Sequence, residues 1–201
     1  MACSAAVSTT ILRLRHATDP GWARAVLGDV DAFLQDHAHN ERKVVQAALI
    51  LAAQHHQHRD LVAAMLELAA EELSHFQRVH DLLAERGKTI GQDQPDPYAG
   101  AMHKLLRKGD VHEYLLDRLI VFAVVEARGC ERFQLVAQAL EPGPLADFYT
   151  ELFKAEARHH GLFTGLAQRI FGREAFTARL DQILEAEGAI VRDLPHRAAL
   201  H

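Results

Sequence analysis

The sequence predicts an all-α protein built on a bundle of four long helices. Apolar residues recur at three- and four-residue steps through four long stretches, as on helices that each bury one face. No stretch shows the apolar and polar alternation that indicates a strand. The chain has 201 residues, of which 49% are hydrophobic and 24% are charged, and this suits one core. We therefore expect a single domain over residues 1–201.

Breaks in the periodicity divide the chain into elements. Residues 1–27 form an N-terminal lead-in, with a short helix that begins at Thr18-Asp19-Pro20 and carries Trp22. Residues 28–172 form the bundle, with helices expected at about 29–57, 59–86 and 110–140, and a fourth that ends near residue 171. Glycine and proline interrupt residues 88–97, and a short helix is expected at about 98–108. Residues 173–201 form a last helix, to about residue 190, and a polar tail.

One long crossover therefore joins the second and third bundle helices, and this is the ferritin-like topology. The short helices before and after the bundle flank it. Only two cysteines occur, Cys3 and Cys130, so we expect no structural disulfide and a reducing compartment. We interpret Cys130 as a small core residue. No apolar run approaches 18 residues, and the segment from Met1 to His16 lacks a signal-peptide pattern. We expect a cytoplasmic protein without a membrane span.

Two Glu-x-x-His motifs are the main chemical signal. They are Glu72 with His75 and Glu156 with His159, and each follows another glutamate, Glu41 or Glu126, by about thirty residues. All four glutamates interrupt apolar helical stripes, so their side chains are expected to face the core. Buried carboxylates without counter-charges are costly, and two divalent cations balance four of them. A Glu from each of two helices and a Glu-x-x-His from each of the other two form the metal site of di-iron and di-manganese bundles.

Other polar residues near these motifs carry weaker signals. Candidates to support the ligands are His37, Arg128, Tyr149 and Arg158, although His37 is equally typical of a satisfied half-buried histidine. For the arginines an ion-pair network is favoured over phosphate contact. His160 is expected at the rim or in solvent, because it is turned about 100° from His159 on a helix. The group His55, His56 and His58 is expected to lie in a solvated loop, not at a second metal site.

Several strings make the chain resemble a known family. They are Asp36-His37 followed by Glu41, Glu71 to Phe76, Glu126 to Phe133, Phe148-Tyr149, and Glu156 to His159. Together they resemble the tRNA 2-methylthio-N6-isopentenyladenosine hydroxylase family, from about Trp22 to the final Leu-His. The string around Glu126 is the most specific of them. Two positions depart from the family pattern: Asn40, where cysteine is common, and Gly129, where serine is usual.

The resemblance implies an oxygen-dependent monooxygenase that hydroxylates the isopentenyl group of the modified adenosine beside the tRNA anticodon. It implies two iron ions, dioxygen as co-substrate, and an external electron donor of the ferredoxin or flavoprotein reductase type. The ligands alone suit iron or manganese. A net charge of −5 means that any RNA contact is local. Candidates for that contact are Lys104, Arg107 and Lys108 on the crossover helix and Arg42 and Lys43 beside Glu41, although each set is also typical of a solvated helix face.

Two other classes of protein fit parts of this pattern. A ferritin-like iron-storage, peroxide-handling or manganese-catalase-type protein would use the same six ligands without RNA. The string around Glu126 disfavours that interpretation. A metal-free helical interaction module would leave four glutamates without counter-charges in the core, so we disfavour it more strongly.

Overall fold

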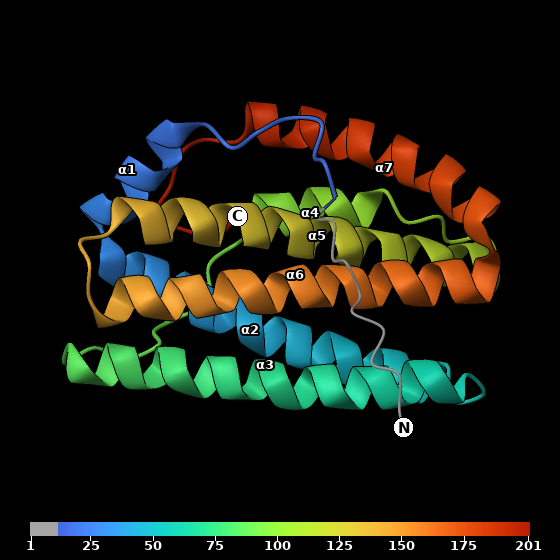
Figure 1. Ribbon diagram of the computed structural model, residues 1–201, viewed down its shortest axis with the longest axis horizontal. Coiled ribbons are helices and arrows are strands. Elements are labelled where there is room, and N and C mark those ends of the chain that lie inside the picture. Colours follow the sequence, from blue (N-terminus) through green and yellow to red (C-terminus); the bar gives the residue numbers. More distant parts are fainter. Residues whose placement is uncertain (1–11) are drawn as a thin grey trace, which may run out of the picture.

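The computed structural model describes residues 12–201, and these form seven helices without a strand (Figure 1). The helices are α1 (Pro20–Gly28), α2 (Val30–Gln54), α3 (Arg59–Glu85), α4 (Pro97–Lys104), α5 (Val111–Ala139), α6 (Pro144–Phe171) and α7 (Arg173–Asp193). The predicted all-α bundle with a long crossover is confirmed. Cys3 and most of the segment searched for a signal peptide lie outside the described residues. Within the described residues, no helix has the length and apolar character needed to cross a membrane.

Local sequence signals account for most of the helix ends. Aspartates begin four of the helices, and each side chain accepts a hydrogen bond from a backbone N–H in the first turn: Asp19, Asp29, Asp96 and Asp110. The expected crossover helix ends earlier than predicted, at Lys104, and residues 105–110 form a turn before α5. Gly172 separates α6 from α7 with a φ of 82°, a conformation that favours glycine.

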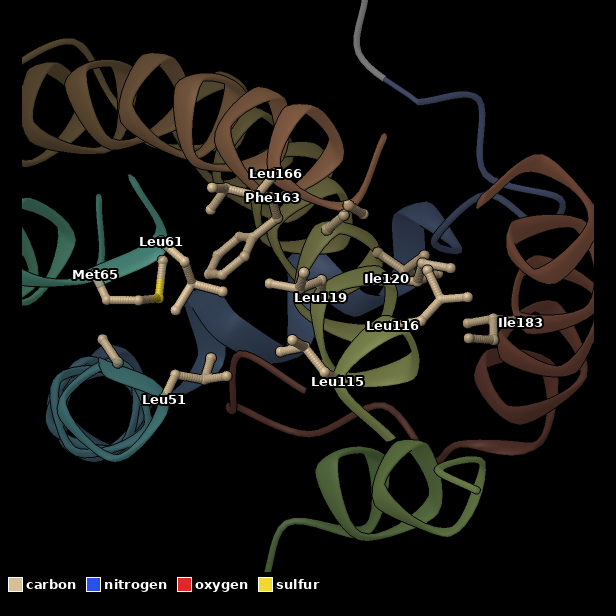
Figure 2. Close-up of a cluster of buried hydrophobic side chains, with 14 of the residues drawn as sticks. Leu51, Leu61, Met65, Leu115, Leu116, Leu119, Ile120, Phe163, Leu166 and Ile183 are labelled. Atoms are coloured by element: carbon tan, nitrogen blue, oxygen red, sulfur yellow. The ribbon is translucent and has the colours of Figure 1, made fainter. Parts of the chain in front are cut away.

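Two helical hairpins make up the bundle. Helix α2 packs along α3, and α5 packs along α6, while α7 lies across α5 on the outer side (Figure 1). One apolar cluster fills the end of the bundle where Leu51 and Met65 approach Leu119 and Phe163, with Ile183 of α7 against the outer side of α5 (Figure 2). A second cluster, which includes Phe33, Val79 and Tyr149, fills the other end. Along α2, α5 and α6 the predicted ligands fall between the residues of these two clusters, so they form a polar layer inside the core.

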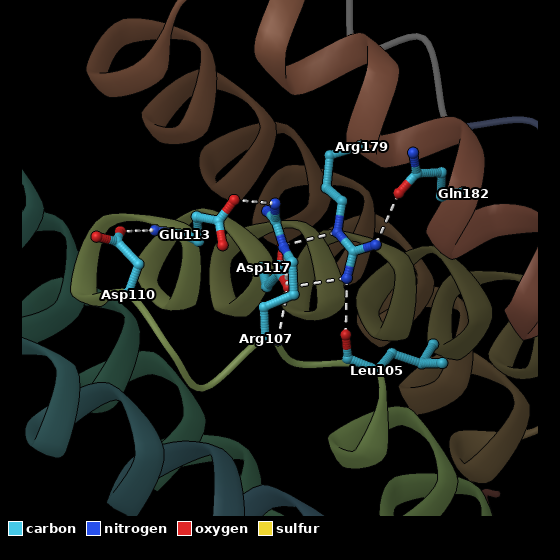
Figure 3. Close-up of polar contacts among 7 residues, drawn as sticks. All are labelled: Leu105, Arg107, Asp110, Glu113, Asp117, Arg179 and Gln182. Carbon is cyan, nitrogen blue, oxygen red and sulfur yellow. Dashed lines mark hydrogen bonds and ion pairs between the residues drawn. The ribbon is translucent and has the colours of Figure 1, made fainter.

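A buried carboxylate fastens the end of the crossover to the bundle. Asp117 of α5 is fully buried and accepts hydrogen bonds from the Arg107 backbone N–H at 2.8 Å and from the Arg107 guanidinium at 2.7 Å. Arg179 of α7 donates to the same carboxylate at 2.8 Å and to the Leu105 carbonyl at 2.7 Å (Figure 3). The segment after α4 is therefore held against both α5 and α7.

Candidate metal centre

The six predicted ligands meet in one buried cluster. Each of them is at most 6% exposed. Their donor atoms form two groups in which all atoms lie within 4.8 Å of one another. One group contains Glu41, Glu72, His75 and Glu156, and the other contains Glu72, Glu126, Glu156 and His159. Glu72 and Glu156 belong to both groups, so either carboxylate could contact ions held by both.

The Glu-x-x-His spacing places each histidine beside the carboxylates of the cluster. Residues three apart lie on one face of a helix, so each histidine sits one turn beyond its glutamate. His75 Nδ1 lies 2.9 Å from Glu72 Oε2, and His159 Nδ1 lies 2.9 Å from Glu72 Oε1. His159 Nδ1 is also 3.6 Å from Glu156 Oε2. Both histidines therefore turn Nδ1 toward the carboxylates.

The electrostatics of the cluster favour cations. Burial, and then repulsion from Glu72, raises the pKa of Glu41 well above its usual value. Burial and repulsion from Glu156 do the same to the pKa of Glu126. For Glu72, burial alone raises the pKa, but hydrogen bonds from His159 and His75 outweigh it, so that the pKa of Glu72 falls below its ordinary value. Without cations the carboxylates must share protons and histidine contacts to remain buried.

The donor atoms fit a pair of divalent metal ions. Glu126 Oε1 and Glu156 Oε2 are buried and have no hydrogen-bond partner among the described residues. Buried polar atoms without partners are rare in native structures, and an absent ion is one of the usual reasons for them. Four carboxylates and two imidazole nitrogens are a donor set that holds iron or manganese. The arrangement can hold two such ions and neutralise all four carboxylates.

A short chain of hydrogen bonds orients Glu41. His37 Nε2 lies 2.6 Å from Glu41 Oε1, and His37 Nδ1 lies 3.2 Å from the Tyr149 hydroxyl. Burial and the nearby charge of His75 lower the pKa of His37 to about 3, so its ring is neutral at physiological pH. A neutral imidazole has one N–H, which can be donated to the Glu41 carboxylate while the Tyr149 hydroxyl donates to the other ring nitrogen. His37 and Tyr149 therefore lie where their predicted supporting role requires.

Glu71 holds the other side of His159. Its Oε2 lies 3.1 Å from His159 Nε2, and its Oε1 accepts a hydrogen bond from Arg158 at 2.5 Å. This close contact with His159 is the main cause that lowers the pKa of Glu71 to about 2. A carboxylate on the outer nitrogen of a metal-binding histidine fixes its tautomer and orientation. Arg158 was predicted from the sequence and Glu71 was not, although the adjacent pair Glu71-Glu72 was a signal.

Three sequence-based expectations need correction. Arg128 does not touch the cluster, so it does not support the ligands; its guanidinium binds Glu187 at 2.8 Å and also Glu131, which is the ion-pair network favoured for the arginines, on the far side of α5. His160 is buried, not solvated, because α5 packs against that face of α6 and the Ala123 carbonyl lies 2.9 Å from His160 Nδ1. His55 is buried at the end of α2, whereas His56 is exposed as expected.

A cavity of about 430 Å³ leads to the glutamates. Its walls come from α2, α4 and α5 and from the last two residues of the chain, and Glu41, Glu72, Glu126 and Glu156 all line it. Apolar side chains form most of the remaining surface, among them Val44, Ile50, Val121, Phe122 and Met102. An elongated apolar group can therefore approach the carboxylate layer from one side.

Both departures from the family pattern also line this cavity. The Asn40 amide donates to Asp36 Oδ2 at 2.9 Å, and the same oxygen accepts the Leu200 N–H at 2.7 Å. Asn40 is therefore tied to the chain segment that closes one end of the cavity. Gly129 faces Glu156, because a Cβ at this position would lie 3.8 Å from Glu156 Cγ. A small side chain would fit there in ordinary contact.

The predicted RNA-contact residues differ in whether a carboxylate already pairs with them. Arg42 and Lys43 both pair with Asp93, at 3.0 and 2.9 Å. Arg107 is held by Asp117 and Glu113, and its contacts are those of a structural residue. The remaining candidates, Lys104 and Lys108, are exposed. Of the five, only Lys43 lines the cavity.

Comparisons with known proteins identify one matching family and two named relatives. A model of the family described as tRNA-(MS[2]IO[6]A)-hydroxylase (MiaE) matches residues 5–201. The tRNA 2-(methylsulfanyl)-N(6)-isopentenyladenosine(37) hydroxylase of Pseudomonas putida is 37% identical over 171 residues, which cover 84% of this chain and 81% of that protein. The enzyme of the same name from Salmonella typhimurium is 36% identical over 122 residues, 60% of this chain and 43% of that protein.

A solved structure shares the fold. Protein 43 with aldehyde deformylating oxygenase activity from Synechococcus has a TM-score of 0.88 and 31% sequence identity, over 94% of this chain and 96% of that one. The family match also spans nearly the whole chain and includes all six clustered residues. The chain therefore belongs to the tRNA-(MS[2]IO[6]A)-hydroxylase (MiaE) family.

Proposed function

We propose that this protein is a tRNA hydroxylase that inserts one oxygen atom into the isopentenyl group of (methylthio)isopentenyladenosine next to the anticodon. The observation that carries the proposal is the apolar cavity that ends on four buried glutamates, in a chain of this family. A prenyl group is apolar and narrow, so the walls that include Val44, Val121 and Phe122 suit it. Hydrophobic walls also keep water from the reacting carbon.

The cofactor of the proposal is a pair of iron ions held by Glu41, Glu72, His75, Glu126, Glu156 and His159. The six donors also suit manganese, and the choice of iron rests on the family likeness. When bound, the metal pair would supply dioxygen reduction, with one oxygen atom entering a C–H bond, the other leaving as water, and two electrons from an external donor. A ferredoxin or flavoprotein reductase is the expected class of donor, and the cytoplasm the expected location.

The chain's own residues position the reaction. Glu71 lies 3.1 Å from the outer nitrogen of His159, where a carboxylate would favour a proton on Nε2 and leave Nδ1 for a metal. His37 and Tyr149 hold one oxygen of Glu41 and leave the other directed into the cluster. A modified base in a single-stranded loop can be turned out of its stack into such a cavity, and this needs few duplex contacts. A binding mode with few RNA contacts is consistent with the net charge of −5, because extensive phosphate binding needs many cations.

Mass analysis of tRNA nucleosides tests the function. In a strain that makes the prenylated adenosine, cells that express this gene should contain the hydroxylated nucleoside, and cells without it should not. Expression of the Glu72→Ala, Glu156→Ala double variant should give no product, because the two carboxylates common to both groups of donor atoms are removed. An unchanged nucleoside profile with the parent gene would contradict the proposal.

A second candidate function rests on the solved structure with the same fold. That protein has aldehyde deformylating oxygenase activity, and the apolar cavity found here would also admit an alkyl chain. Supplying the purified, iron-loaded protein with fatty aldehydes and with prenylated tRNA in parallel separates the two. We expect turnover of the tRNA alone. Turnover of aldehyde without hydroxylated nucleoside would favour the second candidate, and peroxide consumption or a ferric core without either product would favour the storage or peroxide-handling class.

A further inference from the structure

The cavity continues beyond the glutamates as a groove between α2 and α5. On α2, Glu41, Val44, Ala47, Ile50 and Gln54 line it as one stripe, which spans about 20 Å of helix axis. On α5 the lining runs from Glu126 through Phe122 to Arg118 and Tyr114. The two helices run in opposite directions, so Gln54 lies across from Arg118. The groove therefore has the carboxylates toward one end and an arginine at the other.

Arg118 has no acidic partner among the described residues. Its guanidinium donates one hydrogen bond, to the amide oxygen of Gln54 at 2.8 Å, and lies 5.8 Å from the centre of the Tyr114 ring. Neither neighbour is a carboxylate. By contrast, Arg42, Lys43 and Arg107 all pair with carboxylates. Lys104 and Lys108 also pair with no carboxylate in the part of the chain that the structure describes, but they are exposed and do not line the cavity, whereas Arg118 is half-buried and lines it.

The surroundings of Arg118 make that charge costly. The side chain is half-buried, and burial lowers its pKa, with only Tyr114 acting in the opposite direction. His55 lies close enough that Arg118, His58 and His112 add to the effect of burial in lowering the pKa of His55. No carboxylate lines this end of the groove, where the lining residues are Gln54, Tyr114 and Arg118. Partly desolvated charges without partners are typical of sites that bind a charged ligand.

The separation of the two ends suits one nucleotide. Arg118 and Glu126 are eight residues apart, so their Cα atoms are separated by about 12 Å along α5, and the facing stripe from Glu41 to Gln54 covers about 20 Å along α2. These two spans are comparable with the length of an extended prenylated adenosine nucleotide from the tip of its prenyl group to its phosphate. A prenyl group at the glutamates would place a backbone phosphate near the guanidinium. The planar guanidinium fork binds phosphate oxygens in pairs, with Gln54 and Tyr114 to hold its orientation.

We propose that Arg118 binds a phosphate of the RNA substrate at the open end of the groove and so sets how deeply the prenylated nucleotide enters. This inference rests on the proposed tRNA hydroxylase function. It assigns the phosphate contact to α5, whereas the sequence predicted that contact on the crossover helix or beside Glu41. It also explains why Gln54, at the last turn of α2, orients the guanidinium without neutralising it.

Binding of a prenylated anticodon stem-loop RNA to the metal-loaded protein, measured without dioxygen at several salt concentrations, tests the proposal. Arg118→Gln should weaken binding roughly 10- to 100-fold, the range for losing a charge-assisted hydrogen-bond pair. The slope of log affinity against log salt should become shallower by about 0.7 to 0.9, the value for one phosphate contact. Arg118→Lys should recover part of the affinity and the full slope. Arg173→Gln is the matched control, because Arg173 is exposed at the start of α7 and outside the cavity lining.

The outcomes separate this proposal from the function on which it rests. If the parent protein hydroxylates the tRNA but Arg118→Gln binds RNA with the parent's affinity and salt slope, Arg118 is not a phosphate contact. A loss of RNA affinity equal to that of Arg173→Gln would also overturn the proposal, because it would reflect the change in net charge alone. Gln54→Ala provides a second variant should Arg118→Gln unfold, and it should weaken RNA binding in the same direction by a smaller factor. A parent that never hydroxylates prenylated tRNA would refute the proposed function itself.

Discussion

Replacing Asp117 by asparagine should destabilise the protein strongly at neutral pH. Asp117 is fully buried and binds two guanidinium groups and one backbone N–H. Removing one partner of a buried ion pair costs about 3–5 kcal/mol. Here the side chains of Arg107 and Arg179 are 36% and 16% exposed, so water can solvate them after the change. We therefore expect a loss of about 2–3 kcal/mol, or about 5–10 °C in Tm for a chain of this length.

The effect of this change should also depend on pH. Burial by itself raises the pKa of Asp117, but hydrogen bonds from Arg107 and Arg179 outweigh it and hold the pKa below the ordinary 3.8. A carboxylate whose pKa is lowered by folding stabilises the protein above its unfolded pKa and loses that contribution as the pH falls through its folded pKa. Asparagine does not titrate. The difference between the parent and Asp117→Asn should therefore be full at pH 7 and shrink below about pH 3.8.

Urea unfolding at pH 7 and at acid pH measures this difference. Asp81→Asn is the control, because the Asp81 side chain is 75% exposed and pairs only with His80. A surface change of this kind should stay within about 0.5 kcal/mol at either pH. Equal unfolding free energies for Asp117→Asn and Asp81→Asn at pH 7 would refute the argument. A loss for Asp117→Asn that persisted unchanged at acid pH would show that its cause is packing and not charge.

Three further predictions follow from the candidate metal centre. Glu71→Gln should weaken metal binding about 10- to 100-fold, because Glu71 orients His159, whereas Glu67→Gln on an exposed face of α3 should not, and metal titration distinguishes them. Tyr149→Phe should cost about 1–2 kcal/mol in urea unfolding, because it leaves His37 Nδ1 buried without its partner; a cost near zero would show that the hydroxyl is not needed. Chelation of the metal should lower the Tm by about 5–10 °C near neutral pH, since metal at a hundred times its Kd contributes about 2.7 kcal/mol. Equal melting temperatures with and without metal would show that metal binding at the cluster does not stabilise the fold.

The fold and the six clustered residues could be predicted because they depend on helical periodicity. Glu41, Glu72, Glu126 and Glu156 occupy stripe positions, and a stripe position faces the core wherever its helix packs. The three-residue step to each histidine then fixes the rest of the cluster. The aspartates that begin α1, α2, α4 and α5 are likewise local signals. Such features need no knowledge of which helix lies beside which.

Features that join distant elements could not be predicted in this way. Glu71 lies one position off the core stripe of α3, and its role appears only when α6 brings His159 and Arg158 beside it. Arg107 looks like a free basic residue until the turn after α4 places it on Asp117. His160 is buried because α5 lies alongside α6. The cavity depends on the gap between α2 and α5 and on α4 and the last two residues, which close it.

We expect the glutamate and histidine cluster to hold metal ions, and this metal centre to hydroxylate a prenyl group on tRNA. Mass analysis of nucleosides after incubation of iron-loaded protein with prenylated tRNA, a reductant and isotopically labelled dioxygen tests it most directly. We predict a hydroxylated prenyladenosine that carries one labelled oxygen atom with the parent protein, and none with the Glu72→Ala, Glu156→Ala variant. Unmodified nucleoside with fully loaded parent protein, or product whose oxygen comes from water, would contradict the account.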